Sequence, residues 1–241
     1  MTPDFSTTLV VIPAYNEAAS VADVVASVRE ALPGAACLVV DDGSADSTSD
    51  RARSAGAWVA RLPVNLGVGG AMRTGFRFAR RHGFDRVVQV DADGQHLAGE
   101  VPKLLAALDG ADVVIGARFA GAGDYRATGP RRWAMIVLAG VLSRVTGTKL
   151  TDATSGFRAV GPRALAVFAG DFPAEYLGDT VEALVIASRA GCRIVQVPVR
   201  MVERTAGHPS QNAFRSTMYL ARVFLALGFA IARPRRKVLT S

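Results

Sequence analysis

The feature that most constrains the fold of this chain is an alternation of two kinds of segment along its first half. Short runs rich in β-branched residues, typical of buried strands, alternate with longer segments whose apolar residues have helical spacing. This alternation predicts an α/β fold with a mostly parallel central sheet and helices on both faces. The predicted strands span residues 8–13, 37–41, 58–62, 86–90 and 113–116, and the predicted helices span 19–31, 47–55, 69–82 and 100–108.

A polar cluster follows each predicted strand at its carboxyl end. In open α/β sheets this edge is where ligands bind, in a crevice between the loops. One cluster alone would be an ordinary turn, whereas a cluster after every one of these strands predicts a shared binding site. The clusters are Tyr15-Asn16-Glu17, Asp41-Asp42-Gly43-Ser44, Asn65, residues 91–95 and Arg118.

The segment Asp91-Ala92-Asp93 is the candidate metal site. Two carboxylates one residue apart, just past a buried strand, can turn toward one cation, and Gln95 adds a neutral oxygen. Hard oxygen ligands suit Mg²⁺ or Mn²⁺, which also bind substrate phosphates. The alternative is a polar loop in which Asp93-Gly94 makes a turn and one aspartate caps the next helix.

Two further loops have the composition of ligand-binding segments. Asp41 and Asp42 could accept hydrogen bonds from a base or a ribose, while Asp46 or Ser47 could cap the helix that follows. The glycines in residues 67–70 lack the spacing and position of a dinucleotide fingerprint. They are better explained by a close approach of the backbone to a ligand or to the neighbouring strand.

The formal net charge of +7 favours anionic partners, such as phosphorylated substrates or an acidic membrane surface. Nucleic acid is not the expected partner, because the basic residues are scattered and no aromatic platform lies between them. Cys37 and Cys192 each adjoin an apolar run and are predicted to be buried thiols. Residues 1–6 lack the basic n-region of a secretory signal, so a cytoplasmic protein is expected.

The C-terminal segment is apolar but interrupted by arginines. The uninterrupted apolar run 223–232 is too short to span a bilayer. As a helix, the segment would place Arg215, Arg222 and Arg233 on nearly one face, ahead of a basic tail at 233–237. This pattern is typical of a helix in the membrane interface, and the alternative is a helix packed on the domain. We therefore expect one domain over residues 1–210 and an amphipathic, basic helix and tail over 211–241, peripheral at the inner face of the membrane.

Taken in order, the motifs resemble those of family 2 glycosyltransferases of the GT-A fold. The resemblance begins with residues 11–17 (VIPAYNE), 40–44 (VDDGS) and 91–96 (DADGQH), with Asn65 and residues 67–71 between the last two. Later segments resemble the branch that glycosylates polyprenyl phosphates, such as dolichyl-phosphate mannose synthases. These segments are Gly116-Ala117-Arg118, residues 152–158 (DATSGFR), Val197-Pro198-Val199 and Arg204-Thr205-Ala206-Gly207. The resemblance covers roughly residues 7–220.

The resemblance implies a Rossmann-like nucleotide-binding half, an acceptor half and a nucleotide-sugar donor. Asp42 would read the base, and Asp93 and Gln95 would bind a divalent cation. Asp91 and Asp93 would face the ribose and the diphosphate, and Arg204 would contact the diphosphate as well. The implied donor-binding residues are Pro13, Ala14, Tyr15, Glu17, Asp42, Asp91, Ala92, Asp93 and Arg204.

For the acceptor, the resemblance implies a polyprenyl phosphate bound by Arg118 and by an arginine of the pair Arg131-Arg132. A phosphate monoester has a second pKa of about 6 and is anionic at neutral pH, so oriented arginines could suffice without a base. Asp179 and Glu182 are candidates for a base or for orienting an arginine. Glu182 could equally lie on the solvated face of a helix at 180–190.

One departure from the branch concerns a cationic phosphate contact. The branch often has Lys-Ser shortly after the arginine-containing element at residues 204–207, whereas this chain has His208-Pro209-Ser210. That contact is therefore not predicted here.

The sequence thus predicts an inverting transferase that moves a sugar from a UDP- or GDP-sugar to a polyprenyl phosphate at the cytoplasmic membrane face. One alternative is a family 2 transferase that glycosylates a sugar hydroxyl of a glycolipid or polysaccharide. The other is a catalytically silent nucleotide-sugar-binding protein that recruits a partner to the membrane. Intact Asp91, Asp93 and Gln95 argue against the silent protein. The oligomeric state is not indicated.

Overall fold

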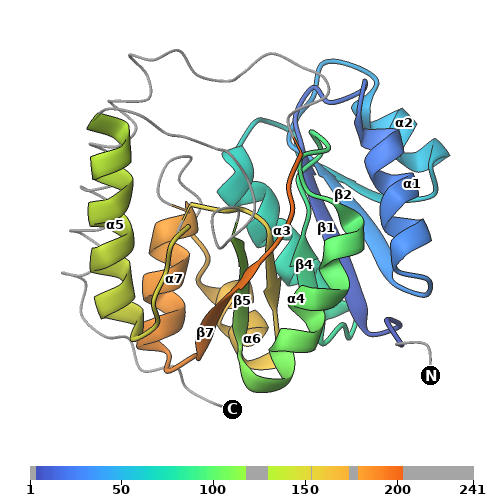
Figure 1. The fold of residues 1–241 in the computed structure, drawn as a ribbon. Helices are drawn as coiled ribbons and strands as arrows, with labels where there is room; N and C mark the ends of the chain where they lie inside the picture. Colours follow the sequence, from blue (N-terminus) through green and yellow to red (C-terminus); the bar gives the residue numbers. More distant parts are fainter. Residues whose placement is uncertain (1–3, 118–129, 153, 174–178, 203–241) are drawn as a thin grey trace.

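A computed structural model of the chain describes residues 4–117, 130–152, 154–173 and 179–202, in which helices cover both faces of a seven-stranded sheet (Figure 1). The strands are β1 (Thr8–Ala14), β2 (Ala36–Asp41), β3 (Trp58–Arg61), β4 (Arg86–Gln89), β5 (Val113–Ala117), β6 (Arg158–Val160) and β7 (Ile194–Pro198). The α-helices are α1 (Val21–Ala31), α2 (Thr48–Ser54), α3 (Gly67–Arg81), α4 (Val101–Ala107), α5 (Pro130–Thr146), α6 (Pro162–Gly170) and α7 (Asp179–Arg189). Short 3₁₀ turns at Ala98–Glu100 and Leu108–Gly110 flank α4.

The strands lie in the order β3-β2-β1-β4-β6-β5-β7. All neighbouring pairs are parallel except those of β6, which is antiparallel to both β4 and β5. The prediction of a mostly parallel sheet with helices on both faces is therefore confirmed. The insertion of β6 was not predicted, because three residues are too few to show a hydrophobic period.

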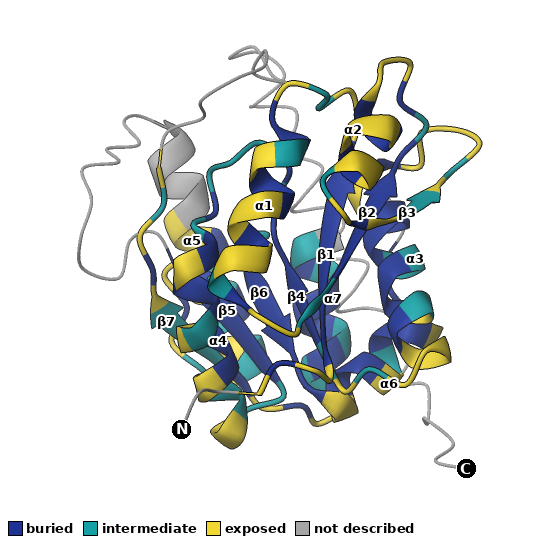
Figure 2. Ribbon diagram, turned by 90° about the vertical axis from the view of Figure 1, so that its right-hand side faces the viewer, coloured by how far each residue is buried: buried dark blue, intermediate teal, exposed yellow. Residues whose placement is uncertain are grey.

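The sheet is buried on both faces, which explains why its strands are nearly continuous apolar runs. Successive side chains of a strand point to opposite faces. In β1, Leu9 and Val11 pack in the core formed with α3, α5, α6 and α7, whereas Val10 and Ile12 pack in the core formed with α1, α2 and α4. Figure 2 shows the buried strands between the helices, whose exposed residues face outward.

Helix α3 lies unusually close to β1, and a glycine makes this possible. A Cβ atom added to Gly75 would lie 2.6 Å from Val11 Cγ1, so no larger residue fits without movement. Gly67, at the start of the helix, has a φ of 78°, a conformation that glycine adopts at low cost. The contact with β1 is made by Gly75, outside the predicted segment 67–70, so the approach of that segment to a ligand or a strand stays a prediction.

The two cysteines are free and buried, as predicted. Burial raises the pKa of Cys37 to about 12, and burial also raises the pKa of Cys192. These thiols stay protonated at neutral pH. Among the described helices, none is long and apolar enough to cross a membrane. The predicted amphipathic helix at 211–241 lies outside the described residues.

Candidate active site

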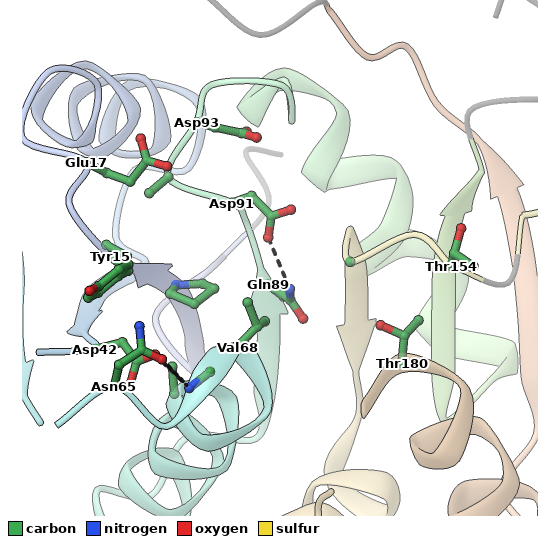
Figure 3. Close-up of a pocket in the computed structure, with 16 residues that line it drawn as sticks. Tyr15, Glu17, Asp42, Asn65, Val68, Gln89, Asp91, Asp93, Thr154 and Thr180 are labelled. Atoms are coloured by element: carbon green, nitrogen blue, oxygen red, sulfur yellow. Dashed lines mark hydrogen bonds between the residues drawn. The ribbon is translucent and has the colours of Figure 1, made fainter. Parts of the chain in front are cut away.

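A cavity of about 530 Å³ opens at the carboxyl ends of β1 and β4. From β1 the chain continues to β2 on one side, whereas β4 lies on the other side, so the strand order reverses between β1 and β4. A crevice at such a switch point is where open α/β sheets bind ligands. Every described residue predicted to bind the donor lines this cavity (Figure 3): Pro13, Ala14, Tyr15, Glu17, Asp42, Asp91, Ala92 and Asp93.

The loop after β1 is tied to the loop after β2 by reciprocal hydrogen bonds. The Asn16 amide N donates to Ser44 Oγ at 2.9 Å, and the Ala45 amide N donates to Asn16 Oδ1 at 2.8 Å. Asn16 has a φ of 55°, and asparagine tolerates this left-handed conformation better than most residues. The Glu17 amide N also donates to Thr48 Oγ1 at 2.9 Å. These bonds fix the wall that carries Tyr15 and Glu17.

Asp41 is fully buried, and its carboxylate serves the fold. Its Oδ1 accepts a hydrogen bond from the Ser44 amide N at 2.8 Å, and its Oδ2 accepts one from the Ser49 hydroxyl. Burial alone would raise the pKa of Asp41, but these bonds, together with the Arg61 charge, hold it below its ordinary value. Asp41 does not line the cavity, so of the two adjacent acids only Asp42 is open to a ligand.

We expect Asp41→Asn to destabilise the fold by about 1.5–3 kcal/mol at pH 7. The asparagine side chain has a single neutral acceptor oxygen, so it cannot accept both of the hydrogen bonds that the carboxylate accepts. Since the folded pKa is lowered, the contribution of Asp41 is present above its unfolded pKa of about 3.9 and is lost as pH falls through the folded value. Urea unfolding of wild type and variant from pH 7 down to pH 3 measures this difference. Asp50→Asn is the control, because Asp50 is exposed and forms an exposed ion pair with Arg53. A difference that grows toward low pH would contradict the assignment.

Asp42, in the loop after β2, caps the N-terminus of α3. Its Oδ1 accepts from the Leu66 amide N at 2.7 Å, and its Oδ2 accepts from the Gly67 amide N at 2.8 Å. Burial and the nearby Asp41 charge raise its pKa, although the two backbone bonds oppose this. The loop that carries Asn65 and the start of α3, where Val68 lies, are thereby fixed near Tyr15 (Figure 3). That Asp42 also reads the base stays a prediction.

The Asp91 carboxylate is held at the centre of the cavity. Gln89 Nε2 donates to its Oδ1 at 3.1 Å, and the two side chains share a face because they are two residues apart at the end of β4. Gly156 lies against both of them. A Cβ atom at Gly156 would be 2.8 Å from Gln89 Nε2 and 3.3 Å from Asp91 Oδ2. Because residue 156 has no side chain, the side chains of Gln89 and Asp91 can occupy this space.

Asp93 combines the two interpretations that the sequence left open. Its Oδ1 accepts from the Gln95 amide N at 3.0 Å, and Gly94 has a φ of 78°, so these residues do form a turn. The Asp93 side chain nevertheless lines the cavity. Gln95, predicted as a second metal ligand, is not among the lining residues in the described part of the chain.

A divalent cation fits this donor set. No group of three or more acidic, histidine or cysteine side chains that could enclose a metal occurs within the described ranges. Mg²⁺ and related ions, however, are commonly bound by one or two carboxylates together with substrate phosphates and water. Asp93, with Asp91 beside it, has the composition of such an open site.

Several predicted residues are not placed by the structure. Arg118 and Arg204 lie outside the described residues, and Arg131 and Arg132 belong to α5 but their side chains are not described. Asp179 is the first residue of α7, and the next residue, Thr180, lines the cavity. Their predicted roles stay predictions.

The cavity also contains residues that sequence reasoning did not assign to the site. Gln89 could have been found, because it alternates with Asp91 on the strand. Gly156 belongs to a segment that was noted only as a motif. The lining residues without a predicted role are Val68, Ala71, Gln89, Thr154, Gly156 and Thr180; Asn65 was predicted only as a polar strand-end residue, and Gly67 only as a position of close backbone approach.

An open α/β sheet with a carboxylate-lined cavity at its switch point defines the class of α/β proteins that bind a ligand at this edge of the sheet. The chain belongs to glycosyl transferase family 2, whose model matches residues 9–167. It is 37% identical over 212 residues to an undecaprenyl-phosphate mannosyltransferase of Micrococcus luteus, covering 85% of this chain and 87% of that protein. It is 34% identical over 211 residues to a polyprenol monophosphomannose synthase of Mycolicibacterium smegmatis, covering 83% and 79%.

Solved structures agree with this assignment. Glucosyl-3-phosphoglycerate synthase from Mycobacterium tuberculosis, in complex with Mn²⁺, UDP and glucosyl-3-phosphoglycerate, superposes with a TM-score of 0.70 at 25% identity, covering 95% of this chain and 81% of that chain. The same enzyme has been solved with Mg²⁺ and UDP. The resemblance to family 2 and the GT-A fold class are thus confirmed, and the protein is a glycosyltransferase.

Proposed function

We propose that the protein transfers a sugar, with inversion, from a UDP- or GDP-sugar to a polyprenyl phosphate. The observation that carries this proposal is that all described residues predicted to bind the donor line one cavity at the switch point of the sheet. Two relatives whose names specify polyprenyl-phosphate substrates match over most of their length, which supports the acceptor.

The donor side requires stabilisation of a leaving nucleoside diphosphate. Asp93, with Gln95 as the other predicted ligand, would hold a divalent cation, and this cation would supply Lewis-acid stabilisation of the developing negative charge. Asp91, held by Gln89, would orient the ribose and diphosphate. Tyr15, Asp42 and Asn65 would surround the nucleoside. Arg204 would add positive charge at the diphosphate.

The acceptor side needs no proton transfer if the nucleophile is a phosphate. An anionic phosphate oxygen forms the new bond to the anomeric carbon, while the bond from that carbon to the donor diphosphate breaks and its electron pair leaves with the nucleoside diphosphate. Arg118 and the pair Arg131-Arg132 would orient the acceptor phosphate. The test is transfer from radiolabelled GDP-mannose and UDP-glucose to a short polyprenyl phosphate and to the matching free alcohol. Equal use of the alcohol would favour a hydroxyl acceptor instead.

Arg118→Ala should lower kcat/KM for the polyprenyl phosphate by roughly ten- to a hundredfold, because a charge-assisted hydrogen bond contributes about 1.5–3 kcal/mol. Donor affinity should change little. Donor Kd by calorimetry and acceptor kinetics, measured on the same preparation, separate these effects. If thermal stability falls and both substrates suffer alike, Arg118 serves the loop after β5 and does not bind the acceptor.

A lipid acceptor also requires contact with a membrane surface. We expect deletion of residues 211–241 to release the protein from anionic vesicles, and added salt to weaken binding of the intact chain, because basic residues near anionic lipid contribute about 1 kcal/mol each. Sedimentation with vesicles at low and high salt measures both effects. If the intact chain does not sediment at low salt, the peripheral assignment at the inner membrane face is wrong.

A further inference from the structure

The segment that follows β4 is closed into a loop by a buried histidine. Just after β4, the Val90 amide N still donates a hydrogen bond to β1, to Val11 O at 3.1 Å. The next amide, that of Asp91, donates instead to Nδ1 of His96 at 3.0 Å. The imidazole of His96 therefore supplies an acceptor at the point where the sheet ends.

His96 is held in one orientation by its surroundings. Its side chain is buried, and its ring stacks on Phe157 with a centroid separation of 4.7 Å and an interplanar angle of 14°. Its backbone forms a bridge to Met201, and the adjacent Gln95 O accepts from the Val202 amide N at 3.1 Å. The ring thus cannot turn away without disturbing the core beside β6 and the segment after β7.

The hydrogen bond determines which ring nitrogen carries the proton. A backbone N–H can only donate, so Nδ1 must present its lone pair, and the proton of a neutral ring is on Nε2. That Nε2 lies 3.6 Å from Asp91 Oδ2, whereas Gln89 contacts the other carboxylate oxygen, Oδ1. Gln89 and His96 therefore each present an N–H toward a different oxygen of Asp91. At 3.6 Å, the approach of His96 Nε2 to Asp91 Oδ2 is an electrostatic contact and not a hydrogen bond.

We propose that His96 is a positioning residue that fixes both the backbone and the carboxylate direction of Asp91 for binding of the donor nucleotide. This inference rests on the proposed function only through the donor, since the acceptor does not enter it. His96 does not line the cavity and acts through Asp91. The competing explanation is that His96 only fills space against Phe157.

Nitrogen NMR of the wild-type protein tests the geometry directly. In a long-range ¹H–¹⁵N correlation spectrum, we expect a bare Nδ1 and a protonated Nε2 for His96. A proton on Nδ1, in either a neutral or a charged ring, would overturn the proposal. This measurement needs no variant and no knowledge of the sugar.

Two substitutions separate positioning from packing. His96→Phe keeps an aromatic ring against Phe157 but removes the acceptor for the Asp91 amide, whereas His96→Asn keeps an oxygen acceptor close to the place of Nδ1 but removes the ring. We expect His96→Phe to weaken binding of UDP or GDP with Mn²⁺ by about ten- to a hundredfold, and His96→Asn to restore most of that loss despite a lower Tm. His82→Phe is the control, because His82 is exposed and stacks on Phe78 away from the cavity.

The two possible failures are distinguishable. If nucleotide affinity follows thermal stability, with the phenylalanine variant binding better than the asparagine variant, His96 is a packing residue and the proposal fails. If wild type binds nucleotide but does not glycosylate polyprenyl phosphate, the proposed acceptor fails while the His96 result stands. If wild type binds neither nucleotide, the proposed donor fails, and the NMR result still decides the geometry at Asp91.

Discussion

Asp93→Ala should lower transfer by about a thousandfold or more, because Lewis-acid stabilisation of a leaving diphosphate contributes several kcal/mol and this carboxylate is the proposed metal ligand. The fold should survive, since Asp93 lies on a loop and loss of the hydrogen bond from the Gln95 amide costs about 1 kcal/mol. Initial rates with GDP-mannose and UDP-glucose across a Mn²⁺ titration, together with Tm, measure both effects.

The matched control for this variant is Asp109→Ala, which removes an exposed acid that does not line the cavity. It should leave turnover and metal dependence unchanged. Near-normal turnover of Asp93→Ala, with metal still required, would assign the ligand elsewhere. Full wild-type activity in excess chelator would remove the cation from the mechanism.

Gly156→Ala should lower kcat/KM by about a hundredfold, since displacement of a positioning group by about 1 Å can have that effect. The added methyl group would lie 2.8 Å from Gln89 Nε2, which must therefore move, and 3.3 Å from Asp91 Oδ2, a tight contact that a small shift of the carboxylate would relieve. The backbone at Gly156 is not in the left-handed region, so the effect is steric. The loss of stability should be modest, about 1–3 kcal/mol.

Two controls test the steric origin. Gly170→Ala adds the same methyl group where nothing lies within 4 Å, and it should be neutral. In a Gln89→Ala background the nearest atom is gone, so Gly156→Ala should cost much less there than in wild type. Equal losses in both backgrounds would mean that Gly156 acts in some other way than by leaving room beside Gln89 and Asp91.

The sequence predicted the part of the site that lies at the ends of the parallel strands β1, β2 and β4. There, the end of each strand is marked by a change from apolar to polar residues, so Tyr15, Asp42 and Asp91 could be assigned to one edge before the fold was known. The structure confirms that they line one cavity. The strand and helix bounds agree within a few residues, as for α3, predicted at 69–82 and observed at Gly67–Arg81.

The second half of the site could not be found in this way. Thr154 and Gly156 precede β6, which runs antiparallel, so the cavity is reached at the start of this strand and not at its end. A glycine that functions by lacking a side chain leaves no chemical signal in one sequence. Residue type also does not reveal that Asp41 accepts hydrogen bonds inside the fold while Asp42 faces the cavity. That difference depends on which backbone amides lie near each carboxylate.

The position of β6 has a consequence for how the chain acquires its structure. Strand β6 lies between β4 and β5, both of which precede it in the sequence. A nascent chain that ends before residue 158 therefore leaves β4 without a partner on one edge and β5 without a partner on either edge, and exposed edges invite pairing with other chains. Because domains are synthesised from the N-terminus, the strands β1 to β5 must wait for a late segment before the sheet is complete. Exchanging β5 and β7 between relatives would therefore require moving β6 with them, since β6 joins them to the rest of the sheet.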